Sequence, residues 1–154
     1  QDVYSIGRLD ADSEGLLLFT NNNRLKTRLL DPKEGHARTY HVQVEGEASP
    51  EQLAQLKVPM TLRIKGKSFI TQGCSARIIN PSWPPRTPPI RARKSVPDSW
   101  LELTLHEGKN RQVRRMTAAV GLPTLRLIRV AMGDWELGEL GTGEWKELTN
   151  NPTP

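Results

Sequence analysis

Hydrophobic and polar residues alternate along two stretches of the chain, and this alternation predicts strands with one buried face. Residues 39–45 read TYHVQVE, with a hydrophobic side chain at every second position. Residues 100–106 read WLELTLH and place leucines at alternate positions in the same way. Successive side chains of a strand point to opposite faces, so both segments are expected in a sheet that packs on a core. Further strands are expected at residues 14–20, 61–65, 75–79 and 124–131.

Three other segments carry the signals of short helices. Ser49 precedes a proline and stands three positions before Gln52, which is the arrangement of a capping box with proline at the first helical position. In residues 110–120, apolar residues recur every three or four positions, and Gly121 follows as a C-terminal cap. The expected helices are residues 24–30, 50–57 and 110–120.

The order of these elements indicates the fold class. Strands and helices are mixed without the regular alternation of parallel βαβ units. We therefore predict an α+β fold with a mixed, largely antiparallel sheet flanked by short helices. A chain of 154 residues fits one domain with a substantial core, so residues 1–154 are expected to form a single domain.

The second half of the chain is strongly basic. Residues 80–97 contain six prolines and four basic residues, and proline at this density predicts a loop. From Arg86 to Arg129, ten Lys and Arg residues stand against three acidic ones, a local balance of +7 in a chain of net charge +5. Such a block favours a polyanionic partner such as nucleic acid, because each cation docked on a phosphate releases counterions. A solvated charged surface without a partner is the alternative.

Cysteine usage and hydropathy exclude two classes of protein. A single cysteine, Cys74, allows no internal disulfide framework and suits a reducing compartment. No apolar run approaches the ~20 residues of a membrane span, and no charged-then-apolar leader is present. We therefore expect a cytoplasmic protein without a membrane partner.

Residues 10–14, DADSE, form an acidic cluster in an otherwise basic protein. An EF-hand calcium loop is excluded, because its twelfth position is Asn21 where a bidentate glutamate is needed. A zinc site is excluded, because the three histidines have no paired spacing and one cysteine cannot complete a structural site. Asp10, two residues after Arg8, then has two interpretations: a turn-stabilising carboxylate with a neighbouring salt bridge, or a reactive group.

Four segments of the chain resemble one enzyme family. Residues 7–22, GRLDADSEGLLLFTNN, resemble the signature of RNA pseudouridine synthases, in particular the RsuA branch. Residues 38–46, 103–134 and 143–149 follow in the order of that branch, so the resemblance covers nearly the whole chain. Residues 83–105 resemble more narrowly the RluE-type enzymes, which act on large-subunit ribosomal RNA. The resemblance implies the pseudouridine synthase catalytic fold and the isomerisation of a specific uridine, in 23S RNA, to pseudouridine.

The resemblance also implies roles for individual residues. Asp10 matches the catalytic aspartate, and Tyr40 matches the active-site tyrosine that stacks on the base. The basic partner of Asp10 is expected at Arg114, with Arg115 as the next candidate. The expected substrate-binding residues are Arg8, Arg111, Arg115 and the apolar Leu127.

The chemistry of the implied reaction limits what else is needed. The isomerisation is redox-neutral and transfers no group between molecules, so neither a cofactor nor a metal is expected. A uridine inside a helix cannot reach a pocket, so the target must be flipped out or already unpaired. The basic residues of the 80–97 loop, with Trp83 beside them, are expected to hold RNA backbone and an unpaired base. These residues are Arg86, Arg91, Arg93 and Lys94, while Arg111, Arg126 and Arg129 are assigned either to phosphates or to structural carboxylates.

A non-catalytic RNA-binding or ribosome-assembly module on the same scaffold is the alternative function. The joint presence of Asp10, Tyr40 and Arg114 favours the enzyme, because a binding module has no chemical need for all three. Family members carry a further strand before the GRLD motif, and many add an S4 RNA-binding domain. Six residues precede Gly7 here, so we expect a monomeric catalytic domain without the S4 domain and without that strand.

Overall fold

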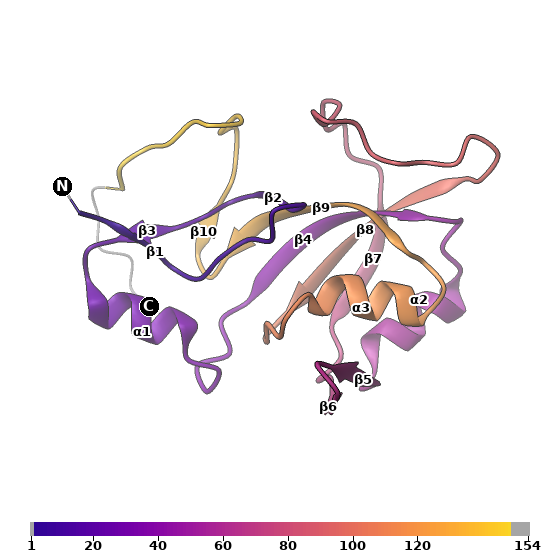
Figure 1. Ribbon diagram of the computed structural model, residues 1–154, viewed down its shortest axis with the longest axis horizontal. Coiled ribbons are helices and arrows are strands. Elements are labelled where there is room, and N and C mark those ends of the chain that lie inside the picture. The colour runs from indigo at the N-terminus through magenta and orange to yellow at the C-terminus, as the bar shows by residue number, and fades with distance from the viewer. Residues whose placement is uncertain (1, 149–154) are drawn as a thin grey trace.

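The computed structural model of the protein describes residues 2–148 and is built around one twisted sheet (Figure 1). The strand order of this sheet is β10–β9–β4–β8–β7, and β2 lies beside β9. These strands are β2 (Glu14–Gly15), β4 (Arg38–Glu45), β7 (Ser75–Ile79), β8 (Asp98–Leu105), β9 (Thr124–Met132) and β10 (Trp135–Glu136). Every pairing is antiparallel except that of β2 with β9. The prediction of an α+β fold with a largely antiparallel sheet is confirmed.

Two small hairpin-like pairs and three helices complete this part of the chain. They are β1 (Tyr4–Ser5) with β3 (Phe19–Thr20), β5 (Thr61–Ile64) with β6 (Lys67–Ile70), and the helices α1 (Asn23–Leu30), α2 (Pro50–Lys57) and α3 (Gln112–Ala119). The capping box of α2 is formed as predicted, with Ser49 and Gln52 bonded to each other's backbone N–H groups. The first helix is confirmed as well, with Asn22 as its N-cap.

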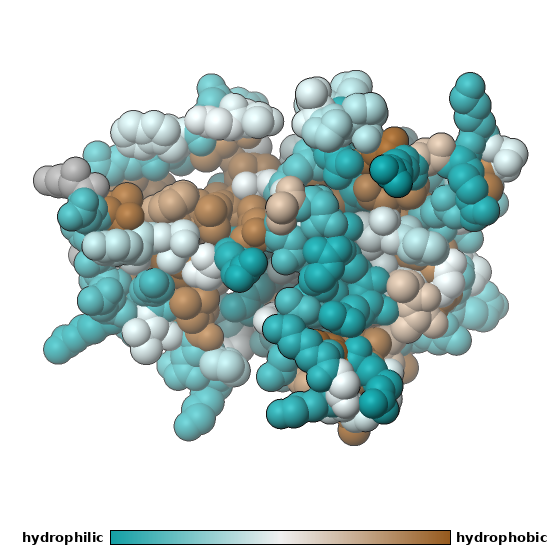
Figure 2. Space-filling view, in the orientation of Figure 1, coloured by the Kyte–Doolittle hydropathy of each residue, from teal (hydrophilic) through white to brown (hydrophobic). Residues whose placement is uncertain are grey.

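The hydrophobic residues of the chain form two separate cores. The larger core lies between the main sheet and helices α2 and α3, where Val42, Leu103 and Met116 are fully buried. The smaller core joins α1 to β1, β3 and the end of β9 through Ile6, Leu29 and other residues. In Figure 2, hydrophobic residues gather on the left over β1, β3 and β10, while a polar band covers α3 and the β5–β6 pair. Strands β4 and β9 extend between these two halves of the molecule (Figure 1).

Residues 14–20 differ from the single strand that the apolar run predicts. Glu14 and Gly15 pair with β9, whereas Phe19 and Thr20 pair with β1, so the run is divided between two partners. Gly15 has a φ of 112°, and a Cβ atom there would lie 2.2 Å from the carbonyl oxygen of Arg129. Only glycine allows the two backbones to approach so closely. This approach fixes the acidic segment against β9.

Three short strands were not predicted. β1 and β10 are two residues long, too short for a period-two pattern to appear. β6 follows β5 through Lys65 and Gly66, which have φ values of 52° and 79°. Positive φ at both central positions is the geometry of a tight hairpin turn, so this Lys-Gly pair was a local signal for the missing strand.

The other boundaries agree with the sequence patterns to within about two residues, as assignments at element ends commonly do. Residues 80–97 contain no helix or strand, as their prolines predict. Helix α3 begins at Gln112, two residues later than expected, because Arg111 has a left-handed backbone with φ of 52°. None of the helices within residues 2–148 is long and apolar enough to span a membrane.

Candidate functional site

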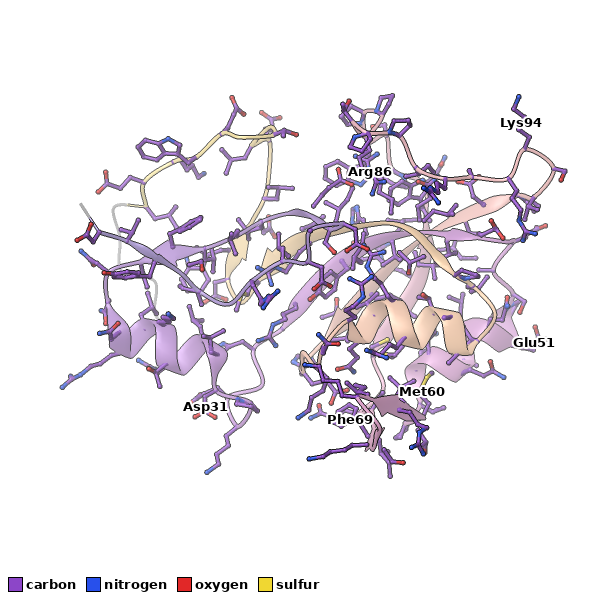
Figure 3. All side chains as sticks on the ribbon, in the orientation of Figure 1. Asp31, Glu51, Met60, Phe69, Arg86 and Lys94 are labelled. Atoms are coloured by element: carbon purple, nitrogen blue, oxygen red, sulfur yellow. The ribbon has the colours of Figure 1, made fainter. Side chains whose placement is uncertain are left out.

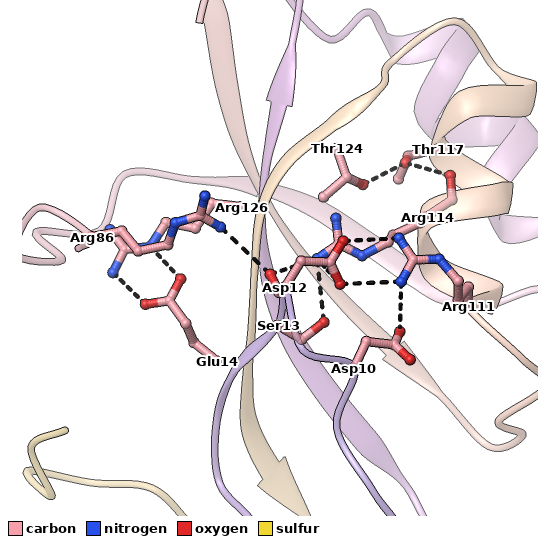
Figure 4. Close-up of polar contacts among 10 residues, drawn as sticks. All are labelled: Asp10, Asp12, Ser13, Glu14, Arg86, Arg111, Arg114, Thr117, Thr124 and Arg126. Atoms are coloured by element: carbon pink, nitrogen blue, oxygen red, sulfur yellow. Dashed lines mark hydrogen bonds and ion pairs between the residues drawn. The ribbon is translucent and has the colours of Figure 1, made fainter. Parts of the chain in front are cut away.

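The acidic turn, residues 10–14, lies where β9 meets the N-terminal end of α3 (Figure 4). The Ser13 N–H donates to the carbonyl oxygen of Asp10 at 2.9 Å, which closes the chain into a turn. The turn then continues into β2, which is held against β9 by the close approach of Gly15. Arg111, just before α3, Arg114 of α3 and Arg126 of β9 surround this turn.

Arg111 binds the Asp12 carboxylate with two parallel hydrogen bonds. Its Nη1 and Nη2 atoms donate to the two carboxylate oxygens at 3.1 and 2.9 Å. Such bidentate pairs are stronger and more directional than single contacts. The hydrogen bonds from Arg111 lower the pKa of the Asp12 carboxyl below its usual range. Arg111 has a left-handed backbone, is not part of the helix and makes no side-chain capping bond. At this end of α3, the side chain of Gln112 accepts a hydrogen bond from the Lys109 N–H.

Arg114 holds the backbone of the turn. Its Nη2 donates to the Asp12 carbonyl oxygen at 2.9 Å and to the Ser13 hydroxyl at 3.2 Å. The side chain is 14% exposed, and this burial lowers the pKa of Arg114. The sequence predicted Arg114 as the partner of Asp10. In the structure Arg111 makes the ion pair with Asp10, at 3.4 Å, whereas Arg114 contacts Asp12 and Ser13 and lies 3.5 Å from the Asp12 carboxylate.

Arg126 pairs with Glu14, the last acid of the turn. Its Nε and Nη2 atoms donate to the two carboxylate oxygens, both at 2.8 Å, and its Nη1 donates to the carbonyl oxygen of Pro84 at 2.8 Å. The arginine is 7% exposed. Of the two assignments left open for Arg126, phosphate or structural carboxylate, the structure supports the second.

Asp10 is the acid of the turn with the fewest contacts. Within residues 2–148, Asp12 and Glu14 are both held by bidentate arginines, whereas the only ion pair of Asp10 is the 3.4 Å contact to Arg111. The Asp10 side chain is 27% exposed. Asp12 and Glu14 are more exposed, at 46% and 29%, so the fewer arginine contacts of Asp10, and not its exposure, leave it the most hydrogen-bonding capacity for a substrate.

Tyr40 and Leu127 are brought to the same face of the sheet as the larger core. In the β4–β9 register, Tyr40 lies opposite Arg129 and Val42 lies opposite Leu127, and residues directly opposite each other share a face. Arg129 donates from Nε to the carbonyl oxygen of Leu16 at 3.0 Å and is 4% exposed. Burial lowers the pKa of Arg129, and its interaction with the Tyr40 hydroxyl opposes that shift. Arg129 thus binds the backbone two residues after the acidic turn and lies opposite Tyr40 in the sheet, while Asp10 and Tyr40 form no hydrogen bond with each other.

The four basic residues predicted to bind RNA from the 80–97 loop lie in different environments. Arg86 is half-buried above the acidic turn, with Nη1 3.5 Å from the Asp12 carbonyl oxygen. Arg93 is exposed but paired with the Glu45 carboxylate. Arg91 and Lys94 are exposed and form no ion pair or side-chain hydrogen bond within the described residues. Figure 3 shows the separation, with Arg86 above the centre of the molecule and Lys94 at the outer end of the loop.

Two predicted substrate-binding residues lie away from these contacts. Arg8 is exposed and forms no ion pair within residues 2–148. Arg115 donates to the carbonyl oxygens of Asn110 and Arg63 and to the side chain of Asn110, so its guanidinium is occupied by the loop before α3 and by β5. The structure therefore does not bring Arg115 to Asp10.

A polar network on the other sheet face was missed by the sequence reasoning. The indole N–H of Trp83 donates to Nδ1 of His41 at 3.0 Å, and Nε2 of His41 is 3.1 Å from the Glu102 carboxylate. Burial would raise the pKa of Glu102, but hydrogen bonds from Arg77 and His41 outweigh it and lower that pKa. The sequence offered one signal for this network. His41 and Glu102 are polar residues at alternating strand positions, and each lies on the polar face of its strand.

A groove of about 2100 Å³ runs behind the acidic turn. It is lined by residues 11–14 of the turn but not by Asp10, by residues 83–88 and by residues 134–148, and Arg126 and Ile128 also line it. Leu127 and Arg129, on the opposite face of β9, do not line it. Within residues 2–148, no group of three or more His, Cys, Asp or Glu side chains is arranged to hold a metal ion.

Comparisons with known proteins identify the family of this chain. Residues 1–119 match the family model described as RNA pseudouridylate synthase. The chain is 52% identical over 157 residues to ribosomal large subunit pseudouridine synthase E of Xanthomonas axonopodis pv. citri (strain 306), which covers 99% of this chain and 80% of that protein. It is 46% identical over 149 residues to the protein of the same name from Vibrio parahaemolyticus serotype O3:K6 (strain RIMD 2210633), covering 96% of this chain and 61% of that protein.

A crystal structure of a pseudouridylate synthase has the same fold. It matches with a TM-score of 0.79 at 30% identity, over 96% of this chain and 56% of that chain. The predicted pseudouridine synthase fold is thereby confirmed. The chain belongs to the RNA pseudouridylate synthase family and is an RluE-like member of its RsuA branch.

Proposed function

We propose that this protein isomerises a specific uridine of large-subunit ribosomal RNA to pseudouridine, with Asp10 as its catalytic carboxylate. The relatives at 52% and 46% identity are named for the large ribosomal subunit, which supports this substrate class. The observation that carries the assignment of Asp10 is its incomplete pairing. Asp12 and Glu14 each accept two hydrogen bonds from one arginine, while the half-buried Asp10 has a single 3.4 Å ion pair among residues 2–148.

The neighbours of Asp10 have distinct roles in this proposal. Arg111 orients the carboxylate, a role that the sequence had assigned to Arg114, and Arg114 keeps the turn in place through the Asp12 backbone. Tyr40 stacks on the everted uracil with its ring. Leu127, on the same face of the sheet, contributes an apolar wall. The target uridine is flipped out or already unpaired, because a stacked base cannot reach a side chain on the sheet.

RNA contacts outside the pocket come from cations that are free of protein partners. Among residues 2–148, Arg91 and Lys94 of the 80–97 loop have this property, and so does Arg8, two positions before Asp10 in the sequence. Their contacts with phosphates offset the cost of everting a base, about a few kcal/mol. Arg86 and Arg93 add to this surface with smaller effect, because both already contact the protein.

We propose that residues 1–154 belong to one pseudouridine synthase catalytic domain and that the protein acts as a monomer in the cytoplasm. All the candidate groups come from one chain, and assembling ribosomes lie in that compartment. The isomerisation is redox-neutral, so we propose that it proceeds without a cofactor or metal.

The test compares two carboxylates of the same turn. Asp10→Asn is expected to lower the rate of pseudouridine formation at least about 1,000-fold, since it removes the reacting group. Asp12→Asn alters a supporting contact and is expected to lower the rate only about 10-fold. Each protein is incubated with an unmodified large-subunit rRNA transcript, and pseudouridine is mapped by carbodiimide-dependent primer extension. The affinity of each protein for the same RNA is measured by filter binding.

The outcomes separate the two candidate functions. Loss of turnover with unchanged RNA affinity in Asp10→Asn supports the catalytic assignment. Full turnover in that variant contradicts it. If the unaltered protein binds the transcript and forms no pseudouridine, the chain is a non-catalytic RNA-binding module.

A further inference from the structure

Arg126 connects two segments that are remote from each other in the chain. Two of its nitrogens donate to the carboxylate of Glu14 in the acidic turn, and the third donates to the carbonyl oxygen of Pro84 in the 80–97 loop, all at 2.8 Å. The residue is almost completely buried. Every guanidinium nitrogen is therefore used, and the two segments cannot move apart without breaking a buried, charge-assisted hydrogen bond.

The same part of the loop has two further attachments. We call residues 83–88 the inner loop and residues 89–95 the outer loop. Trp83 donates to His41 on β4, and the two rings meet edge to face with centroids 5.6 Å apart. Arg86 donates from Nε to the Pro88 carbonyl oxygen at 2.9 Å, and its Nη1 lies 3.5 Å from the carbonyl oxygen of Asp12. The inner loop is thus fixed both to the sheet and to the acidic turn.

The outer loop continues directly from this fixed segment and carries the free cations Arg91 and Lys94. The inner loop in turn contacts Glu14 through Arg126 and the Asp12 carbonyl oxygen through Arg86, and both acids belong to the five-residue turn that contains Asp10. Such a chain of packed and bonded groups can carry energetic coupling between two sites.

We propose that Arg126 is a positioning residue that couples RNA binding by the proline-rich loop to the placement of Asp10. The inference rests on the proposed function, because it needs RNA on the outer loop and catalysis at Asp10. Arginine is required for this role, since its planar fork serves a carboxylate with two donors and a carbonyl with a third. Lysine keeps the positive charge but cannot hold the same bidentate geometry.

The experiment measures single-turnover rates on two RNAs. The first is a short stem–loop of large-subunit rRNA around the uridine that the unaltered protein modifies, and the second is the same stem–loop with its natural flanking sequence. The unaltered protein is expected to react about 10-fold faster on the longer RNA, because contacts remote from the reacting bond improve orientation at it. Arg126→Lys is expected to lose this gain, with its affinity for the longer RNA changed less than about 3-fold.

The gain on the longer RNA distinguishes positioning from a general structural role. A variant that is merely less stable loses rate on both RNAs equally, so an equal loss overturns the proposal, as does an undiminished gain in Arg126→Lys. Arg91→Gln combined with Lys94→Gln is expected to lose the same gain, and combining these changes with Arg126→Lys is expected to add nothing further. Full additivity of the two sets overturns the coupling.

Two more variants complete the design. If Arg126→Lys does not fold, Glu14→Gln decides, because it removes the charge of the carboxylate that Arg126 binds, and an unchanged gain in Glu14→Gln overturns the proposal. Arg63→Lys is the matched control, because Arg63 also donates to a backbone carbonyl, that of Gly66, but on the exposed β5–β6 pair. If the unaltered protein forms no pseudouridine on either RNA, the proposed function itself fails, which is a different result from a lost gain.

Discussion

The acidic turn and the outer loop both concentrate charge, but they use it in opposite ways. In the turn, residues 10–14, arginines from α3 and β9 neutralise the carboxylates or hold the backbone at distances of 2.8–3.5 Å. In the outer loop, residues 89–95, Arg91 and Lys94 are exposed and have no acidic partner among the described residues. Arg93 is intermediate, because it is exposed but pairs with Glu45.

This difference separates cations that shape the protein from cations that are available to a partner. A buried, bidentate arginine loses much if it exchanges its carboxylate for an RNA phosphate, because both charges would have to be desolvated and paired again. An exposed lysine loses little, and it releases counterions when it docks on a phosphate. The density of basic residues along the chain therefore does not locate the RNA-binding surface by itself. The arginines that pair with carboxylates of the protein have to be left out of the count first.

The largest expected effect comes from breaking the turn without changing any charge. Gly15→Ala places a Cβ against the backbone of Arg129 and also imposes a positive φ on alanine. Overpacking and strain together are expected to lower the free energy of unfolding by about 3 kcal/mol. Urea unfolding followed by circular dichroism measures this.

Gly66→Ala is the control, because its φ is also positive but nothing lies within 4 Å of the added atom. The free energy of unfolding is expected to fall by about 1 kcal/mol in this variant. Equal losses would show that β2 is not held by close approach.

The next effect tests whether Arg111 orients Asp10. Arg111→Gln removes both the bidentate pair with Asp12 and the contact with Asp10, and kcat is expected to fall about 100-fold through misplacement of the carboxylate. Arg111→Lys retains the charge without the fork, so a smaller loss of about 10-fold is expected. Single-turnover assays on the rRNA transcript give both values. If Arg114→Lys lowers kcat more than Arg111→Gln does, and the two variants are equally stable, Arg114 is the functional partner of Asp10, as first expected from the sequence.

A smaller effect is expected from the outer loop. Arg91→Gln with Lys94→Gln removes two free cations, and the slope of log K against log salt is expected to become shallower by about 1.4 for single-stranded RNA. Filter binding over a range of salt concentrations measures the slope. Arg93→Gln is expected to change it less, because that guanidinium already has Glu45 as its partner. A larger change from Arg93→Gln than from the pair would contradict the distinction between free and paired cations.

Local signals in the sequence were sufficient for most of the fold. The alternation in β4 and β8, and the capping box formed by Ser49 and Gln52, depend on residues a few positions apart. The tight turn at Lys65 and Gly66 was such a signal as well, although its strand was missed. These features can be recognised because the physics that produces them acts within one segment of chain.

The arrangement of the site depended on contacts that no local pattern records. Glu14 meets Arg126 and Leu16 meets Arg129 across more than a hundred residues. The left-handed backbone of Arg111, which takes it out of α3, is not specified by its side chain type. The family resemblance named Asp10, Arg111 and Arg114, which the fold brings together, but which arginine faces which acid followed only from the fold.

The smallest expected effect concerns the free energy of unfolding at acidic pH. Hydrogen bonds from Arg111 lower the pKa of Asp12 below the usual value of 3.8. Its contribution is therefore fully present above about pH 4 and is lost as the pH falls through the lowered pKa. The Asp12 side chain is 46% exposed, so the contribution is expected to be below about 1 kcal/mol.

Urea unfolding between pH 7 and pH 2 should show that Asp12→Asn is less stable than the unaltered protein at neutral pH and equal to it at pH 2. Asp134→Asn, at an exposed residue with no ion pair among residues 2–148, should show no such convergence. A deficit in Asp12→Asn that persists undiminished at pH 2 would mean that the arginines hold the acidic turn by its backbone alone.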